Sequence, residues 1–190
     1  MTRLVLASAS PRRRELLEAA GIECDVDAAE VDETPAMGEA PSTYVLRVAR
    51  LKAEAVAARH PDRPVLGADT AVLVGSQMLG KPADPADASR MLAQLSARAH
   101  DVLTGVAVAF RGQVYAEVEQ TTVWVSKLTP DDIAWYVLSG ESMDKAGGYA
   151  IQGLASRFVP RIEGSYTNVV GLPIAAVYAT LGRYLSRKSL

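Results

Sequence analysis

The sequence has 190 residues, of which 49% are hydrophobic and 22% charged, as in folded globular domains rather than disordered or fibrous chains. A chain of this length buries about 70% of its unfolded surface, so one domain over the whole chain, 1–190, needs no disulfide or metal to fold. The net charge of -2 excludes a general attraction to nucleic acid or anionic lipid. Any anion-binding site must therefore be local.

Two further features narrow the class of protein. The lone Cys24 and the two histidines, His60 and His100, exclude an internal disulfide and most histidine-rich zinc sites. The chain starts with a short apolar run and an arginine-rich turn, and no stretch approaches the ~20 apolar residues of a membrane span. We therefore expect a cytoplasmic protein without a membrane or nucleic-acid partner.

Apolar periodicity and turn residues predict alternating strands and helices. In chain order, the pattern predicts a strand over 3–7, a helix over 11–20, a strand within 24–31, a helix over 42–59, a strand over 64–69, a hairpin over 71–79, a helix over 84–97, β runs over 100–110 and 113–127, and helices over 129–139 and 173–185. Ser10 and Ser42 are the predicted N-caps of the first two helices.

Three consecutive arginines, residues 12–14, fall in the first turn of a predicted helix, where the helix dipole already disfavours cations. Backbone N–H groups, the hydroxyls of Ser8 and Ser10, and guanidinium groups together make a phosphate cradle. The alternative is a solvated basic turn that pairs with nearby acids.

Two residues lie where their surroundings predict chemistry. Lys52 shares the helical phase of Val45 and Val48, so it points inward toward a phosphate or a carboxylate, unless it snorkels along the apolar face. Asp69 ends an apolar strand, the position where open α/β sheets bind ligands. It suits deprotonation of a water or binding of a divalent cation, with a turn-forming role as the alternative.

Other charged residues give weaker signals. Asp32 and Glu33 become metal ligands only if another acid lies nearby, and otherwise form a charged loop. Lys81 follows the predicted hairpin as a phosphate-directed point charge or as a solvated turn lysine. The sequence lacks G-x-S-x-G, a P-loop and a dinucleotide-binding fingerprint, which excludes those catalytic and nucleotide-binding designs.

Seven segments follow one another in a distinctive order: LASASPRR (6–13), VDE (31–33), KA (52–53), GADT (67–70), GKP (80–82), HDVLTGV (100–106) and DKAGGYAIQG (144–153). Together they resemble the Maf family of nucleoside triphosphate pyrophosphatases over nearly the whole chain. The resemblance implies an α/β fold with a mixed twisted sheet flanked by helices, in two lobes with a central cleft, similar to inosine triphosphate pyrophosphatases. It also implies hydrolysis of a nucleoside triphosphate to the monophosphate and pyrophosphate, with Mg²⁺ or Mn²⁺.

The resemblance also implies a role for each matching residue. Asp69 matches the proton acceptor, and Glu33 joins it as a metal ligand. Lys52 and Lys81 match catalytic positions that face phosphate. The substrate-binding positions are Ser8, Ser10, Arg12, Arg13, Thr70 and Gln152.

The segments 144–153 and 162–173 resemble the branch of the family that acts on dTTP and UTP, rather than the branch that acts on 7-methyl-GTP. Arg12, Thr70 and Gln152 match the positions linked to base choice. A glutamine amide both donates and accepts hydrogen bonds, which suits the O4 and N3–H edge of uracil or thymine. The alternative is that the Gln152 amide hydrogen-bonds to the backbone of its own loop. One departure is Ser142, where the family commonly has proline, and we expect it to loosen that loop.

The sequence therefore predicts a dTTP/UTP pyrophosphatase that also clears modified pyrimidine nucleotides. Two alternatives stay open: a pyrophosphatase for 7-methyl-GTP or for ITP and XTP, and a nucleotide-binding regulator of septum formation with little turnover. The predicted partner is a small-molecule nucleotide, and analogy favours a homodimer.

Overall fold

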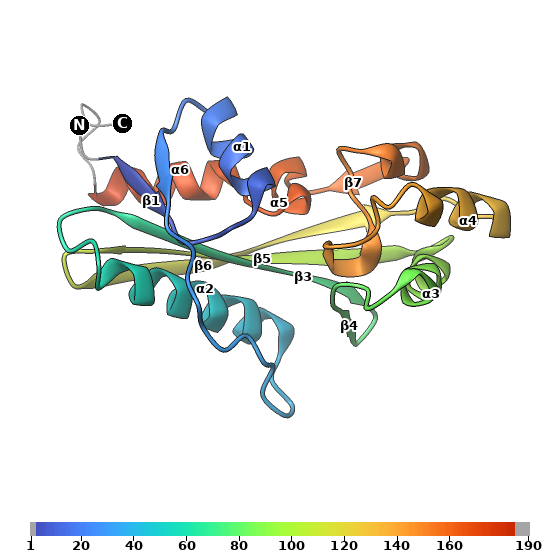
Figure 1. The fold of residues 1–190 in the computed structure, drawn as a ribbon, viewed down its shortest axis with the longest axis horizontal. Helices are drawn as coiled ribbons and strands as arrows, with labels where there is room; N and C mark the ends of the chain where they lie inside the picture. Colours follow the sequence, from blue (N-terminus) through green and yellow to red (C-terminus); the bar gives the residue numbers. More distant parts are fainter. Residues whose placement is uncertain (1–2, 185–190) are drawn as a thin grey trace. The chain divides into compact units, whose positions relative to one another are not determined.

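The computed structural model describes residues 3–184. Figure 1 shows its strands and helices in chain order: β1 (Leu4–Leu6), α1 (Pro11–Ala19), β2 (Cys24–Val26), α2 (Pro41–Ala57), β3 (Val65–Val74), β4 (Gln77–Leu79), α3 (Pro85–Leu95), β5 (Ala99–Phe110), β6 (Gln113–Trp124), α4 (Pro130–Leu138), the 3₁₀ helices η1 (Ala146–Gly148) and η2 (Leu154–Phe158), β7 (Arg161–Glu163), α5 (Tyr166–Val170) and α6 (Ile174–Tyr184). None of the helices in this range is both long and apolar enough to cross a membrane.

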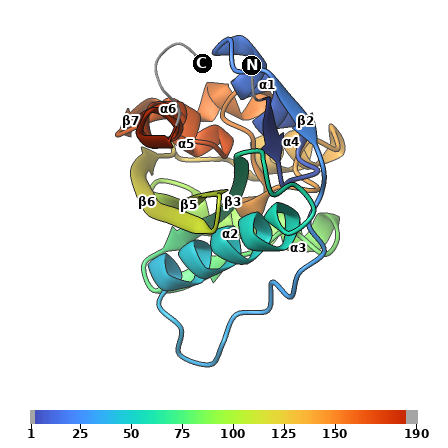
Figure 2. The same cartoon turned by 90° about the vertical axis from the view of Figure 1, so that its left-hand side faces the viewer.

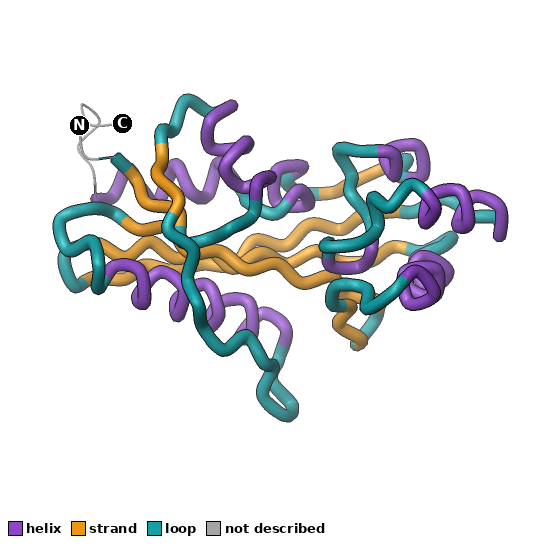
Figure 3. The backbone as a smooth tube through the Cα atoms, in the orientation of Figure 1, coloured by secondary structure: helices purple, strands orange, loops and turns teal. Residues whose placement is uncertain are grey.

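Within the described residues, seven strands form one mixed sheet in the order β2-β1-β3-β5-β6-β7, and β4 pairs with β3 (Figure 3). β1 runs parallel to β2 and β3, whereas β3–β4 and β6–β7 are antiparallel. The turn between β5 and β6 has positive φ at Arg111 and Gly112, as a two-residue type I′ hairpin requires. The structure thus confirms the predicted α/β class and its mixed sheet.

The chain divides into two compact units. The first contains residues up to Asp69, 104–119 and the chain from Gly171 onward, and the second contains 70–103 and 120–170. Each unit has its own apolar core. The core of the second unit centres on Leu95, Val123 and Tyr136. The single domain over 1–190 and the cleft between lobes stay predictions.

In the first unit, alternation along the strands sorts apolar side chains onto two faces. One face packs against α1 and α6 through Leu4, Leu6, Leu66, Ala68, Val106 and Val108. The other face packs against α2 through Val5, Val65, Ala107 and Ala109. Odd-numbered positions of β3 in this unit therefore face α2, and Asp69 is one of them.

Two glycines let α2 lie unusually close to the sheet (Figure 2). A Cβ on Gly67 would meet Ala49 O at 2.2 Å, and one on Gly105 would meet Val45 O at 2.3 Å. No side chain fits at either distance. These glycines therefore bring the buried face of α2, which carries Lys52, into contact with β3 and β5.

Of the two predicted N-caps, Ser42 is wrong, whereas Ser10 is confirmed in position. Ala40, not Ser42, is the N-cap of α2, because Pro41 occupies the first helical position, where its missing N–H costs nothing. Ser10 is the N-cap residue of α1 but makes no side-chain cap hydrogen bond. Its own N–H instead donates to the Ser8 hydroxyl. Residue type therefore predicted the N-cap position of α1 but not its hydrogen bond, and it misplaced the N-cap of α2.

The strand predicted over 64–69 is longer than expected. β3 continues through Asp69 to Val74, so Asp69 lies inside the strand rather than at its end. The register with β1 ends at Leu66, whereas β3 also pairs with β5 along its other edge and with β4 from Val72. Asp69 therefore follows the segment of β3 that pairs with β1, at the carboxyl end of the parallel strands, where open α/β sheets bind ligands.

Candidate active site

The site lies in the first unit, where β1 and β3 stop pairing. The last hydrogen bond between these strands joins Ala7 N–H to Leu66 O at 2.8 Å. Ser8 follows β1 directly, and Asp69 lies three residues past Leu66 on β3. Both side chains are buried, with 8% and 7% exposed for Ser8 and Asp69. The parallel pairing thus brings two sequence-predicted residues to the same end of the strands.

Lys52 joins the two predicted carboxylates. Its Nζ lies 2.9 Å from Asp69 Oδ1 and 2.9 Å from Glu33 Oε1. Lys52 is only 7% exposed, which confirms the predicted inward orientation and excludes snorkelling. The ammonium between two carboxylates offsets part of their mutual repulsion and keeps both pointing toward one place.

Tyr44 is a site residue that the sequence argument missed. It lies on α2 at i−8 from Lys52, and burial followed by the nearby charges of Asp69 and Glu33 raises its pKa to about 12. The phenol therefore stays a hydrogen-bond donor at neutral pH. The signal was available, since residues 44, 48 and 52 share one face of a helix.

The loop that carries Glu33 is fastened to α2. Arg47 donates from Nε and Nη2 to the Glu39 carboxylate at 2.7 and 2.8 Å, and from Nη2 to Thr34 O at 3.1 Å. This guanidinium lowers the pKa of Glu39 to about 2. Asp32 accepts the Thr34 N–H in a turn, which is its alternative structural role. The loop places Glu33, rather than Asp32, on Lys52.

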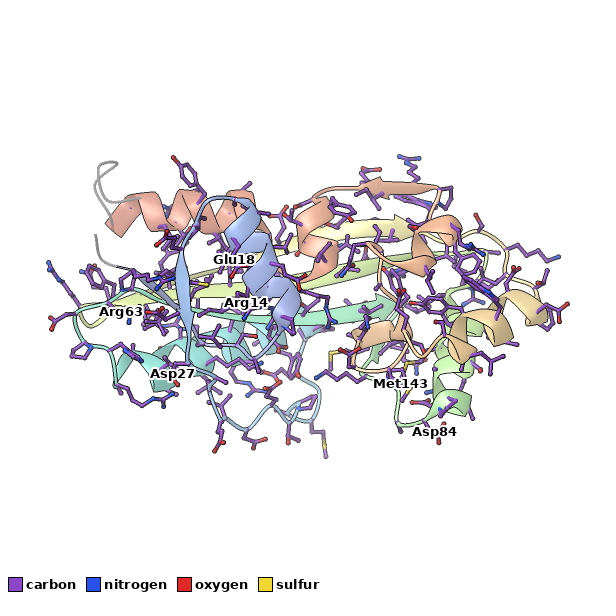
Figure 4. All side chains as sticks on the ribbon, turned by 45° about the horizontal axis from the view of Figure 1, so that its top comes forward. Arg14, Glu18, Asp27, Arg63, Asp84 and Met143 are labelled. Carbon is purple, nitrogen blue, oxygen red and sulfur yellow. The ribbon has the colours of Figure 1, made fainter. Side chains whose placement is uncertain are left out.

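The three consecutive arginines of α1 have different surroundings. Arg14 is half-exposed and pairs with Glu18 one turn later at 3.4 Å (Figure 4). Arg12 is half-buried. Arg13 is 9% exposed and donates to Gly171 O, Ala68 O and the Ser8 hydroxyl. Burial lowers the pKa of its guanidinium, although the Asp69 and Glu33 charges oppose that shift.

The remaining predicted residues belong to the second unit. Thr70 follows Asp69 on β3, and strand alternation places it on the opposite face of that strand. Lys81 is exposed. The Gly147 N–H donates to Gly80 O at 3.0 Å, so the 144–153 segment holds the backbone next to Lys81.

Gln152 lines an open groove in the second unit with a volume of about 420 Å³. The other lining residues are Ile151, Ser156, Val159, Pro160, Arg161, Ile162 and Tyr166. A groove of this volume falls within the range of small-molecule sites. The groove offers the Gln152 amide together with an exposed aromatic ring, that of Tyr166.

A hydrogen-bond network that sequence reasoning missed supports the Gln152 segment. The Tyr136 hydroxyl donates to Glu141 Oε1 at 2.8 Å and accepts the Ala150 N–H at 3.1 Å. Glu141 Oε2 accepts the Leu154 N–H at 3.1 Å. Residues on both sides of Gln152 are therefore anchored to α4 and to the turn after it.

Glu33 and Asp69 fit a divalent cation by their chemistry. Both carboxylates converge on Lys52, and Mg²⁺ commonly takes one or two carboxylates together with substrate phosphates. Among residues 3–184, no group of three or more His, Cys, Asp or Glu side chains forms a complete metal cage. The donor set thus suits a cation that arrives with a polyphosphate.

A family model described as a Maf-like protein matches residues 3–184. The chain belongs to the Maf-like protein family. A dTTP/UTP pyrophosphatase of Myxococcus xanthus is 53% identical to it over 182 residues, which cover 96% of this chain and 92% of the relative. A dTTP/UTP pyrophosphatase of Koribacter versatilis is 51% identical over 180 residues, with 95% and 93% covered.

Among solved structures, the Ham1 protein of Staphylococcus aureus has a TM-score of 0.47 and 16% identity, over 65% of this chain and 71% of that one. By sequence, the Maf-like chain matches the two named pyrophosphatases nearly end to end. Within its first unit, the structure brings together Ser8, Arg13, Glu33, Lys52 and Asp69. Thr70 directly follows Asp69 in the chain, whereas Lys81 and Gln152 belong to the second unit and their approach to this group stays a prediction.

Proposed function

We propose that this protein hydrolyses dTTP and UTP to the nucleoside monophosphate and pyrophosphate. Two Maf-like relatives at 53% and 51% identity carry that activity in their names. The observation that carries the proposal is the buried Asp69 carboxylate, held by Lys52 beside Glu33 at the end of the β1–β3 pairing. Clearing of modified pyrimidine triphosphates is part of the same proposal.

Asp69 is the proton acceptor in this account. It takes a proton from a water whose oxygen attacks the α-phosphorus, and the bond to the bridging oxygen breaks so that pyrophosphate leaves. Hydrolysis in ¹⁸O-labelled water tests the position of attack. The label enters the monophosphate if this step is correct, and label in the pyrophosphate contradicts it.

Cationic and hydroxyl groups stabilise the triphosphate charge. Lys52 and Lys81 are the proposed catalytic lysines, and their charges oppose the negative charge that develops on the phosphate oxygens. Ser8, Ser10 and Arg12 surround the N-terminus of α1, where backbone N–H groups favour anions.

Glu33 and Asp69 are the proposed ligands of a divalent cation, Mg²⁺ or Mn²⁺. Such a cation neutralises phosphate charge and polarises the phosphoryl group. The convergence of both carboxylates on Lys52 supports this assignment. Activity that survives a chelator would remove the cation from the proposal.

The groove around Gln152 supports pyrimidine recognition. The amide of Gln152 complements the O4 acceptor and N3–H donor of uracil or thymine, and Thr70 and Arg12 are the other proposed base-choice residues. The backbone on either side of Gln152 is anchored at Ala150 and Leu154, which supports a fixed place for this residue in the groove.

Pyrophosphate release from dTTP, UTP, CTP, 7-methyl-GTP and ITP, with Mg²⁺ or Mn²⁺ and with a chelator, tests the function. Preference for dTTP and UTP supports it. Preference for 7-methyl-GTP or ITP keeps the chemistry but overturns the base assignment. Tight binding without release of pyrophosphate from any of the five points to the nucleotide-binding regulator instead.

Two properties of the whole molecule complete the proposal. We propose a cytoplasmic homodimer whose partner is the nucleotide alone. The net charge of -2 supports the absence of a nucleic-acid partner. Light scattering on the purified protein measures the assembly, and a monomer at micromolar concentration would contradict the dimer.

A further inference from the structure

Three consecutive arginines on one helix point in three directions, because successive α-helical residues are about 100° apart. Arg14 reaches solvent and Glu18. Arg12 is half-buried. Arg13 is buried against the sheet. The motif therefore cannot present all three guanidinium groups to one ligand in the same way.

The hydrogen bonds of Arg13 connect three segments that are distant in sequence. Its Nε donates to Gly171 O at 2.9 Å, just before α6. Its Nη1 donates to Ala68 O at 2.9 Å and to the Ser8 hydroxyl at 3.0 Å. Each of these acceptors is neutral, although the charges of Asp69 and Glu33 act on the same guanidinium.

Each of these contacts has a consequence for the site. Ala68 directly precedes Asp69, so holding its carbonyl fixes the backbone that carries the proposed proton acceptor. The Ser8 hydroxyl accepts from both Arg13 and the Ser10 N–H, which uses its two lone pairs. Its own hydrogen is then left to donate outward, as a phosphate-binding hydroxyl must.

We propose that Arg13 is a positioning residue, which fixes the Asp69 backbone and aims the Ser8 hydroxyl, and that it does not bind the polyphosphate itself. This inference rests on the proposed function and replaces the phosphate contact that family resemblance implies for Arg13. Arginine suits the task because its planar fork presents several donors in fixed directions, whereas the single ammonium of lysine does not reach three carbonyl and hydroxyl acceptors together.

A matched series of Arg12→Lys, Arg13→Lys and Arg14→Lys tests the inference by steady-state kinetics with dTTP and by inhibition with inorganic pyrophosphate. Arg13→Lys lowers kcat by about 100-fold, because a small displacement of reacting groups has that cost. It raises KM and the pyrophosphate inhibition constant by no more than about tenfold, since the Ser8 hydroxyl loses its aim while the other phosphate-binding groups remain. Arg12→Lys raises both constants further, and Arg14→Lys matches the unaltered protein.

Two kinetic results overturn the inference. One is an Arg13→Lys protein that raises KM and the pyrophosphate inhibition constant as Arg12→Lys does, with kcat retained. The other is an Arg13→Lys protein that is indistinguishable from the unaltered one. Failure of the unaltered protein to release pyrophosphate from any nucleotide is a separate result, which rejects the proposed function.

Nuclear magnetic resonance of the unaltered protein gives a test that needs no folded variant. The Nε–H of Arg13 is bonded to Gly171 O in a buried position, so it exchanges slowly with water in the free protein. Adding inorganic pyrophosphate leaves its exchange and shift in place and moves the Nε–H signal of Arg12. Fast exchange in the free protein, or an Arg13 signal that moves with pyrophosphate as Arg12 does, overturns the inference.

Discussion

The Lys52 ammonium lies 2.9 Å from the carboxylate of Asp69, and both side chains are less than 10% exposed. Lysine and aspartate come from different elements, α2 and β3, so the distance depends on how closely helix and strand approach. Gly67 allows that approach, because the backbone of α2 occupies the space that a side chain at this position would fill. The geometry of the site thus depends on a residue with no functional group.

Gly67→Ala should reduce kcat and destabilise the fold. The new methyl group would lie 2.2 Å from Ala49 O, so α2 must move away and carry Lys52 from Asp69. Overpacking of this kind costs about 1–3 kcal/mol of the free energy of unfolding. Denaturant unfolding and pyrophosphate release measure the two effects.

Gly182→Ala is the matched control for that substitution. Gly182 lies in α6, where an added Cβ meets nothing within 4 Å, so alanine should stabilise the helix by up to about 1 kcal/mol. A Gly67→Ala protein as stable and active as Gly182→Ala would show that close approach of α2 does not position Lys52.

His100 should make stability fall in mild acid. Burial lowers its pKa from 6.5 to about 4, and its Nε2 lies 2.7 Å from the Tyr149 hydroxyl. Below pH 6.5 the imidazole of His100 binds a proton in the unfolded chain but stays neutral in the folded chain. The free energy of unfolding is therefore highest above pH 6.5 and declines toward pH 4. At pH 4.5 this loss amounts to about 2.5 kcal/mol.

The measurement is the free energy of unfolding at pH 7.5 and pH 4.5, for the unaltered protein and for His100→Gln. Glutamine accepts the Tyr149 hydrogen but does not titrate, so the variant should lose less stability over this interval. Equal losses in both proteins would assign the acid sensitivity to other groups.

Gln152→Ala should cost pyrimidine preference more than phosphate binding. The ratio of kcat/KM for UTP over ITP should fall by about tenfold or more, because a site built for a polar edge discriminates through those hydrogen bonds. Inhibition by inorganic pyrophosphate should stay unchanged. Gln113→Ala, an exposed glutamine at the start of β6, is the control. An unaltered substrate profile in Gln152→Ala would reject the base-reading role.

Ser142→Ala should leave the protein equally stable or more stable. The Ser142 side chain is fully buried and its Oγ has no hydrogen-bond partner among the described residues. Removing an unsatisfied hydroxyl should raise the free energy of unfolding by about 1 kcal/mol. Ser139→Ala, which loses bonds to Tyr136 O and Glu141 N–H, should lower it instead. A strong loss in Ser142→Ala would indicate a hidden partner.

The sequence predicted those parts of the site that depend on local pattern. Helical phase alone placed Lys52 inward, and the strand–turn–helix order placed Ser8 in the turn between β1 and α1. The helix predicted over 129–139 is also present as α4, where local residues, Thr129 and Asp132, form a capping box. Such features need only neighbours within one turn of helix or one step of strand.

Features that depend on long-range contacts were missed. The burial of Arg13 depends on Gly171, which is 158 positions away in the chain. The support of the segment around Gln152 depends on Tyr136 and Glu141, which lie outside that segment. No local pattern specifies these partners, so residue type alone gave Arg13 a different role from the one its contacts support.

Asp69→Asn tests the central claim most directly, because asparagine keeps the shape of the side chain and removes its ability to accept a proton. Release of pyrophosphate from dTTP and binding of dTTP should be measured on the same preparation. We predict that turnover is abolished while the dissociation constant stays within about tenfold. Turnover that persists in Asp69→Asn would contradict the assignment of Asp69 as the proton acceptor.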